Sequence, residues 1–356
     1  MRLILHSLAF FIPVAVLAAL TRGLLLGSQS PFFVLLATSV VAILIALDVF
    51  SQPGRSAPDD RVPDGVWEAI LWALVVLHLA TIALLPLYVF RAGFSLASLL
   101  AVFLVGNASA QGIVLAHELI HRVDRLHRLA GRAILAGVLY EHFFTEHIRG
   151  HHRRVATLED PATARYGERF WPFFARTVPA QLQSAWALES KRIRATSLID
   201  RRQLHNRVLH GLLAAWGAAA LIGIALGPLA LLAHLGQALF AVVMLEGVNY
   251  MEHWGLQRAQ RRVSVVDSWD SESGLTYYML IGLARHGDHH AHAARPYQAL
   301  RHYEETPKMP WGYLATAYCA VFADFLLIPR LDAELRRRGL GPYRDPPPAE
   351  PAPSRA

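Results

Sequence analysis

The sequence predicts an all-α membrane protein, six transmembrane helices with a histidine-rich cap on the cytoplasmic side. Composition is the first observation, because 54% of the 356 residues are hydrophobic and 17% are charged, with a mean hydropathy of +0.32. Such a chain is too apolar for an ordinary soluble domain of this length. The second observation is run length, since six apolar stretches approach the roughly 20 residues that cross the hydrocarbon as a helix. The third is the one-sided placement of Lys and Arg.

The expected spans are uninterrupted apolar runs. The first has the position of a signal peptide, but it lacks a clear basic start and cleavage site, so we expect it to remain as an anchor. Pro, Gly, Ser and Asp dominate residues 51–65, which is typical of a surface loop. The six spans lie near residues 3–20, 31–50, 66–90, 94–116, 208–226 and 229–250.

Two long polar segments, 117–207 and 251–340, carry most of the positive charge. Residues 122–207 hold 16 Lys and Arg, whereas the short links near Arg22, Arg91 and Gly227 hold one, one and none. Cytoplasmic loops retain basic residues, so we expect both segments and both termini on the cytoplasmic face of a bacterial-type inner membrane. Topology and anionic lipid explain the net charge of +7 without any nucleic-acid partner.

Residues 1–340 are expected to form a single membrane domain, because no internal repeat or further linker is apparent. The segment 341–356 is rich in proline, a composition typical of an unfolded tail.

Histidine is unusually frequent, with 18 residues, and half of them form four clusters at the ends of spans or just beyond. In HELIH, a spacing of four places two rings on one helix face, where they can share a metal. In EHIRGHH, the first and second histidines repeat that spacing, and the third points about 100° away, toward a possible second ion. The clusters contain His117 and His121; His147, His151 and His152; His253; and His286, His289 and His290.

The chemistry of these clusters points to metal held by nitrogen and oxygen. Cys319 is the only cysteine, so thiolate clusters and thiolate zinc fingers are excluded. Nine imidazoles exceed what one ion accepts, and imidazole suits iron, zinc and copper. Two metals are therefore expected, and iron that activates dioxygen is favoured where an apolar substrate can arrive from the lipid.

The clusters resemble those of a known family, the integral-membrane non-haem di-iron alkane monooxygenases (alkane 1-monooxygenases), within the fatty acid desaturase and hydroxylase superfamily. HELIHR at 117–122 is similar to the family's HELGHK box, EHIRGHH at 146–152 to EHxxGHH, and LARHGDHHA at 283–291 to LQRHSDHHA. NYMEHWGL at 249–256 resembles the NYxEHYGL element that separates the hydroxylases from plain desaturases. Departures at Ile120, Arg122, Trp254, Ala284 and Gly287 leave every ligand in place and bear on substrate preference.

The resemblance implies that the nine clustered histidines bind two iron ions, with dioxygen as co-substrate. It implies insertion of one oxygen atom into an unactivated C–H bond of a hydrophobic substrate, with terminal hydroxylation of an n-alkane to a 1-alkanol as the favoured reaction. The division of the ligands between the irons stays open. Electrons would come from rubredoxin or a ferredoxin-type reductase, and Arg149, Arg153 and Arg154 are candidates for docking that acidic carrier, or else form a solvated or lipid-facing patch.

Four carboxylates adjoin the expected ligands in sequence. Metal-bound histidines usually donate their second N–H to a carboxylate or carbonyl, so we expect these residues to orient ligands. His142 departs from the pairing pattern and is expected to be structural, and Asp160 and Glu168 belong to a loop. The four candidate orienting residues are Glu118, Glu146, Glu252 and Asp288.

Several alternatives remain. A desaturase, or a hydroxylase of another lipid, an alkyl-aromatic or a terpenoid, would use the same irons. HELIH also fits the zinc protease pattern HExxH with Glu118 as general base, but that hypothesis leaves the other three clusters unexplained. A metal transporter or haem carrier would place its ligands in the middle of the membrane rather than at span ends.

Overall fold

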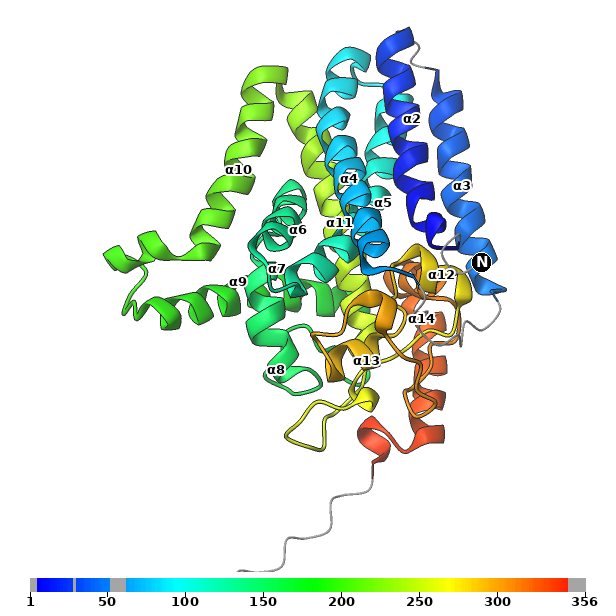
Figure 1. Cartoon of the computed structure of the whole chain (residues 1–356), viewed down its shortest axis with the longest axis vertical. Helices are drawn as coiled ribbons and strands as arrows, with labels where there is room; N and C mark the ends of the chain where they lie inside the picture. Colours follow the sequence, from blue (N-terminus) through cyan, green and yellow to red (C-terminus); the bar gives the residue numbers. More distant parts are fainter. Residues whose placement is uncertain (1–4, 28–29, 52–61, 345–356) are drawn as a thin grey trace, which may run out of the picture.

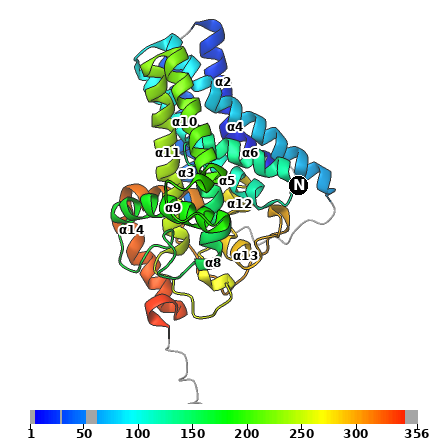
Figure 2. The same ribbon diagram turned by 90° about the vertical axis from the view of Figure 1, so that its left-hand side faces the viewer.

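The computed structural model describes residues 5–27, 30–51 and 62–344. Within these ranges the regular structure is helical, and the only β-type pairing is an isolated bridge between Asp270 and Lys308. The prediction of an all-α membrane protein is confirmed. Long helices stand side by side to form a bundle, and shorter helices and loops form a cap at one end of it (Figures 1 and 2).

Six helices of the bundle lie where the sequence predicts spans. Large apolar side chains on their outer surfaces are exposed, such as Leu221 and Ile224 of α10 at 67% and 83%, as expected for helices that face lipid. The helices are α2 (Phe11–Leu26, preceded by the 3₁₀ turn η1, His6–Phe10), α3 (Pro31–Val49), α4 (Asp64–Ala92), α5 (Leu96–His121), α10 (Arg207–Leu226) and α11 (Pro228–His253).

Local signals explain where these helices begin and end. Ser30 caps α3 by accepting from the backbone N–H of Phe32, and Ser95 caps α5 by accepting from that of Ser98. Helix α2 ends at Gly27 and α4 at Gly93, both with positive φ, a conformation that glycine adopts without a steric cost. Helices α4 and α5 are therefore joined by a short turn and run antiparallel (Figure 1).

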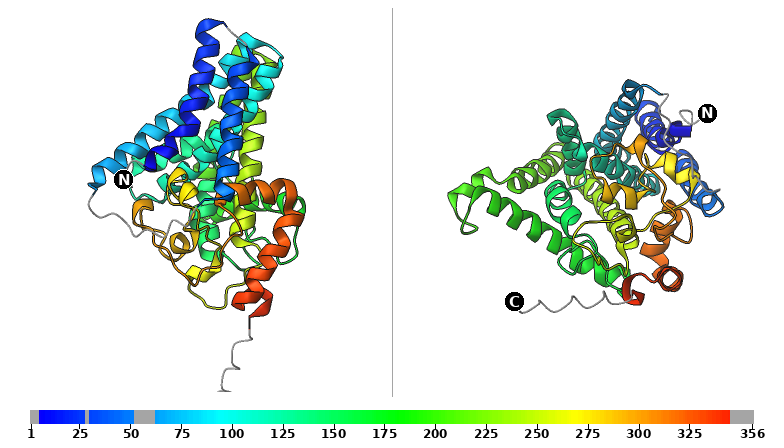
Figure 3. Two further views of the ribbon diagram at one scale, coloured as in Figure 1. Left: turned by 90° about the vertical axis from the view of Figure 1, so that its right-hand side faces the viewer. Right: turned by 60° about the horizontal axis from the view of Figure 1, so that its bottom comes forward.

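A further helix, α14 (Tyr313–Arg338), belongs to the stretch Tyr313–Tyr343, which also meets the length and hydropathy expected of a span. The sequence analysis expected no span there. Ala323 has non-helical dihedrals (φ −150°, ψ 44°), so α14 consists of two shorter helices joined at a bend. Figure 3 shows its first part crossing the base of the bundle and its second part running along the cap. Neither part alone is long enough to cross a bilayer.

The cap is built from the two polar segments of the chain. Its helices are α6 (Arg125–Gly137), α7 (Phe143–Glu146), η2 (His147–His151), α8 (His152–Arg154), α9 (Phe170–Ile193), η3 (Arg201–His205), η4 (Val265–Asp267), α12 (Gly274–Met279), α13 (His286–Ala291), η5 (Tyr297–Ala299) and η6 (Gly341–Tyr343). The first residues of the segment expected to be an unfolded tail are ordered, because Gly341–Tyr343 forms a 3₁₀ turn with Gly341 buried against Gly255. Residues 345–356 lie outside the described ranges.

A buried carboxylate at the end of α3 joins the bundle to the cap. Asp48 is 1% exposed. Its Oδ1 accepts a hydrogen bond from Ser273 Oγ at 2.5 Å, and its Oδ2 accepts from the backbone N–H of Ala315 at 3.0 Å. Gly312 lies so close that a Cβ there would come within 2.0 Å of Asp48 Oδ1. Asp48 thus caps α14 and fixes its first part against α3.

Replacing Asp48 with alanine should lower the stability of the junction. Loss of a helix cap costs about 1–2 kcal/mol, which corresponds to a fall of a few degrees in the unfolding temperature of the detergent-solubilised protein. Asp48→Asn keeps the size and one acceptor oxygen and should lose less. An alanine variant that unfolds at the wild-type temperature would contradict the capping role.

Candidate metal centre

The nine clustered histidines converge on one region at the junction of bundle and cap. They come from the end of α5, from η2 and α8, from the end of α11, and from α13. Their ring nitrogens form two groups, in each of which the nearest ligand atoms lie within 4.8 Å of one another. The five-histidine group contains His117, His121, His147, His152 and His289, and the four-histidine group contains His151, His253, His286 and His290.

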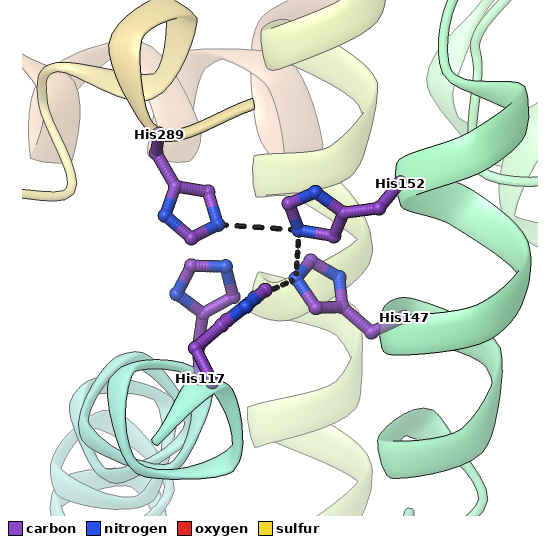
Figure 4. Close-up of side chains that lie close together, drawn as sticks. His117, His147, His152 and His289 are labelled. Atoms are coloured by element: carbon purple, nitrogen blue, oxygen red, sulfur yellow. Dashed lines mark hydrogen bonds between the residues drawn. The ribbon is translucent and has the colours of Figure 1, made fainter. Parts of the chain in front are cut away.

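The five-histidine group has the spacing of ligands around one ion (Figure 4). The Nε2 atom of His147 lies 3.0 Å from those of His121 and His152, and the Nε2 atoms of His152 and His289 are 3.2 Å apart. Two nitrogens at right angles on a metal, each about 2.1 Å from it, are about 3.0 Å apart. The Nε2 atom of His117 is buried without a hydrogen-bond partner among the described residues.

The four-histidine group is completely enclosed. Its rings are at most 4% exposed, and the Nε2 atoms of His286 and His290 lie 2.9 Å apart. The ring of His253 has its centroid 4.8 Å from that of His151 and 5.1 Å from that of His290. Both ring nitrogens of His253 lack a partner in the described part of the chain, so the protein itself leaves these buried polar atoms unsatisfied.

The division of ligands within EHIRGHH differs from the one the sequence predicts. The α-helical spacing of four favours His147 and His151 on one helix face, with His152 directed toward a possible second ion, although the full division of the ligands was left open. The chain instead forms a π-helical turn at His147–His151, and the wider turn aligns His147 with His152, five residues on. His151 is directed to the other group.

The two groups are neighbours. The rings of His152 and His290 are stacked with centroids 4.4 Å apart, and those of His147 and His151 are 5.3 Å apart. Each group contains more than two imidazole nitrogens, and within each group these nitrogens come from several different helices. The arrangement therefore fits two metal ions side by side.

Burial keeps the imidazoles in the form that binds metal. Removal from water lowers the pKa of His147, His152, His289 and His290 well below 6.5, and the neighbouring rings lower it further. Neutral imidazole is the ligand form. Buried, neutral nitrogen donors without protein partners are the donor set expected of a metal site, so the residues present fit the predicted metal binding.

Two buried carboxylates contact the histidines of the enclosed group. Asp160 Oδ2 lies 2.9 Å from His151 Nδ1, and Glu252 Oε1 lies 3.0 Å from His286 Nδ1. Glu252 also accepts a hydrogen bond from the Tyr313 hydroxyl. Burial would raise the pKa of Asp160, but the contact with His151 and the hydrogen bond from Thr163 Oγ1 together lower it. Asp160 and Glu252 can therefore hold the orientation of ligand rings.

The remaining three candidates contact arginines instead. Glu118 Oε1 lies 2.8 Å from Arg122, and Glu146 Oε1 lies 2.5 Å from Arg154. Asp288 is paired with Arg295 and with His292, which belongs to neither histidine group. The three carboxylates were expected to orient histidine ligands, and these contacts do not meet that expectation. Each carboxylate instead pairs with a guanidinium, which forms stronger charge-assisted hydrogen bonds than a neutral imidazole.

Asp160 was assigned to a loop by the sequence analysis, and its contact with His151 was missed. Because His151 is nine residues away, the only signal was that VATLEDPATARYGE at 155–168 resembles the stretch that follows the family's second histidine box. Glu168 in the same stretch has a structural contact, because it binds Arg176. His142 is buried and belongs to neither group.

The three candidate docking arginines differ in their surroundings. Arg149 binds the buried carboxylate of Glu189 at 2.6 Å, and Arg154 binds Glu146 and Ser184 Oγ. Only the side chain of Arg153 is fully on the surface. It follows His152, which is one of two partly exposed ligands, His121 being the other.

An apolar cavity meets the metal centre from the bundle side. His117, His147 and His286 line its inner end, so both histidine groups border it. It extends between α5, α11, α12 and α14 as far as Ile12 of α2 and Val41 of α3. The arrangement can present an apolar molecule to two metals while excluding water.

The fold and the site define a membrane-embedded metal-binding protein. The chain belongs to the fatty acid desaturase family, whose model matches residues 94–320.

Among similar proteins, alkane 1-monooxygenase 1 of Pseudomonas aeruginosa is 40% identical over 218 residues, which cover 60% of this chain and 57% of the relative. Alkane 1-monooxygenase 1 of Alcanivorax borkumensis is 32% identical over 287 residues, 78% of this chain and 70% of the relative. The chain thus spans little more than half the length of the relative with the higher identity. The resemblance inferred from the histidine boxes is confirmed.

Replacing Asp160 with asparagine should weaken metal binding by the four-histidine group. Loss of a carboxylate that orients a ligand typically costs 10- to 100-fold in affinity. Metal retained per chain, measured after equilibration with a graded series of chelators, reports the change. Asp288→Asn is the matched control, because Asp288 adjoins a ligand in sequence but contacts none, and it should retain metal as the wild type does. Equal retention by Asp160→Asn would remove Asp160 from the site.

Proposed function

We propose that the protein is a membrane di-iron monooxygenase that inserts one oxygen atom of dioxygen into a terminal C–H bond of an n-alkane, giving a 1-alkanol. The observation that carries the proposal is the pair of adjacent histidine groups at the inner end of an apolar cavity. All nine candidate ligands are nitrogen donors, which suits iron. The similarity to alkane 1-monooxygenases supports the substrate class.

The irons, when bound, would supply oxygen activation and accept two electrons per turnover. The chain's own residues hold and orient the ligands. Asp160 accepts from the second nitrogen of His151, and thereby fixes the tautomer in which the opposite nitrogen is free for metal. The carboxylate of Glu252 lies 3.0 Å from the second nitrogen of His286 and helps to position that ring. Burial of the four-histidine group excludes water, which would otherwise compete with the substrate.

The cavity determines which part of the substrate reacts. Its walls are largely apolar and its inner end is formed by the ligands themselves, so an alkyl chain presents one end to the metals. Holding that end in place lowers the entropic cost of reaction and restricts it to the terminal carbon. An unbranched alkane is the substrate that such a narrow apolar passage favours.

The electron donor is proposed to be rubredoxin or a ferredoxin-type reductase. No cysteine cluster is available in this chain, whose sequence has one cysteine, so electrons come from a separate acidic carrier. The carrier docks on the cytoplasmic face of the inner membrane, where His121 and His152 reach the surface beside Arg153. Arg149 and Arg154 hold the fold through ion pairs with the buried carboxylates of Glu189 and Glu146.

The zinc protease alternative gains no support from the site. Glu118 would have to act as general base, but it is bound to Arg122 and to the backbone N–H of Tyr297. HELIH supplies only two of the five nitrogens in its group. A desaturase would use the same metals, and product analysis separates it from a hydroxylase.

The proposed reaction is tested with the iron-loaded, purified protein, a reduced carrier, isotope-labelled dioxygen and n-alkanes. We expect about two irons per chain, one for each histidine group, and a 1-alkanol that carries the label. An alkene, with all of the label in water, would show desaturation instead. His253→Ala removes a ligand of the enclosed group and should abolish turnover while the protein stays inserted in the membrane; full activity would exclude His253 from the site.

Carrier docking is tested by charge reversal at Arg153. Arg153→Glu should raise the apparent KM for the carrier several-fold, because it replaces an attraction to the acidic carrier with a repulsion. The difference from the wild type should be larger at low than at high ionic strength, because salt screens both interactions. The kcat at saturating carrier should change little. Arg201→Glu is the control, since Arg201 is exposed in η3, at the distant turn between α9 and α10 (Figure 1). Equal carrier kinetics in both variants would place the docking surface elsewhere.

A further inference from the structure

Besides Asn249, which donates to Glu246, three polar side chains line the cavity away from the metals. They are Asn107 and Gln111 of α5 and Tyr318 of α14, which we call the remote polar group. Asn107 and Gln111 are one helical turn apart and share a face of α5. Gln111 precedes the ligand His117 by six residues and Asn107 precedes it by ten, so their backbones lie about 9 Å and 15 Å further along the helix axis.

The side-chain oxygen of Gln111 receives no hydrogen bond from the described residues. Its Nε2 donates to the backbone oxygens of Ala9 and Met279, both at 3.0 Å. Two carbonyl acceptors require the nitrogen to face them, which fixes the orientation of the amide. The Oε1 atom is left buried with no partner among the described residues, and the whole side chain is only 7% exposed. A buried acceptor of this kind favours any ligand that brings a donor.

Tyr318 and Asn107 offer the same kind of group. The Tyr318 hydroxyl donates to Asn107 Oδ1, and Asn107 Nδ2 donates to the backbone oxygen of Phe103 at 2.9 Å. The Tyr318 oxygen still has a free lone pair, whereas its proton is used. The unused groups are therefore two acceptors, Gln111 Oε1 and the Tyr318 oxygen, and one N–H of Asn107, which together match a hydroxyl that both donates and accepts. The remote polar group suits a ligand with an O–H group better than an ether, an ester or a carboxylate.

We propose that the cavity binds a medium-chain primary alcohol with its hydroxyl at the remote polar group and its methyl end at the metal centre. The inference rests on the proposed function and adds a second substrate class to it. A carbon–carbon bond of about 1.5 Å advances an extended chain by about 1.25 Å per carbon. Distances of about 9–15 Å along α5 thus correspond to roughly seven to twelve carbons.

The reaction of such an alcohol follows the same balance as that of an alkane. One C–H bond of the far methyl group breaks and a C–O bond forms, so that one atom of dioxygen enters the new hydroxyl group. The other atom leaves as water with two protons from solvent. The reduced electron carrier supplies the two electrons. The product is a diol with a hydroxyl at each end.

The test compares three ligands of equal length on the full-length protein in lipid nanodiscs. 1-Decanol has a hydroxyl donor, 1-methoxynonane has an oxygen without a donor, and undecane has neither. Their dissociation constants come from displacement of radiolabelled 1-decanol, which needs no turnover. We expect 1-decanol to bind about three- to tenfold more tightly than 1-methoxynonane, the range of one hydrogen bond, and to yield 1,10-decanediol.

Two variants remove the acceptors separately. Gln111→Met and Tyr318→Phe should each weaken binding of 1-decanol about three- to tenfold, with little effect on 1-methoxynonane and undecane. If Gln111→Met fails to fold for want of its two backbone contacts, Tyr318→Phe still decides. Tyr250→Phe is the matched control, because its hydroxyl donates to the Glu168 carbonyl, which also accepts from Trp254 Nε1. It should bind all three ligands as the wild type does.

Equal affinity of the wild type for 1-decanol and 1-methoxynonane would overturn the inference. That result is expected if Gln111 Oε1 accepts a hydrogen bond only from water. Variants that weaken all three ligands alike would overturn it too. Failure of the proposed function has a different signature, since undecane would then not be hydroxylated by any of the proteins. The displacement measurements would still decide whether the remote polar group binds a hydroxyl.

Discussion

The centre depends on burying neutral imidazoles whose ring nitrogens have too few partners in the protein. Both nitrogens of His253 and the Nε2 atom of His117 are buried without one among the described residues. Each such atom costs about 1–3 kcal/mol if nothing replaces its bond to water. Metal coordination supplies the missing bonds, and the contacts of Asp160 and Glu252 keep two of the rings oriented for it. The surrounding fold therefore stabilises a ligand set that is unfavourable without its ions.

The scaffold that holds these ligands also fixes the distance between the metal site and the remote polar group. Helix α5 carries His117 and His121 at its end and contributes Asn107 and Gln111 to the cavity. A continuous helix has a fixed rise per residue, so the separation between metals and remote polar group does not depend on loop conformation. On the opposite wall, the first part of α14 is held against α3 by Asp48, which accepts from Ala315 N–H and Ser273 Oγ. The cavity is thus bounded by elements whose positions are fixed at one end by buried polar contacts.

The sequence was informative where a rule depends on local periodicity. Apolar run length predicted the helices of the bundle, and the spacing and number of histidines predicted a metal-binding site. It failed where geometry is not local. The π turn at His147–His151 changes which rings coincide, and α-helical spacing cannot foresee it. Neighbours in sequence were also poor guides to contacts, since Asp288 adjoins His289 but binds Arg295, whereas Asp160, nine residues from His151, contacts it.

The two histidine groups face different surroundings, and this asymmetry fits the proposed chemistry. His121 and His152 of the five-histidine group are partly exposed on the cap, whereas all four rings of the other group are enclosed. The cavity reaches His117 and His147 of the first group and His286 of the second. A carrier docked near Arg153 would therefore deliver electrons to one side of the centre while the alkyl chain approaches from the other. The stacked rings of His152 and His290 bring the two groups into contact. Electrons that arrive at the exposed side can therefore reach the enclosed group without the carrier or water entering the apolar cavity.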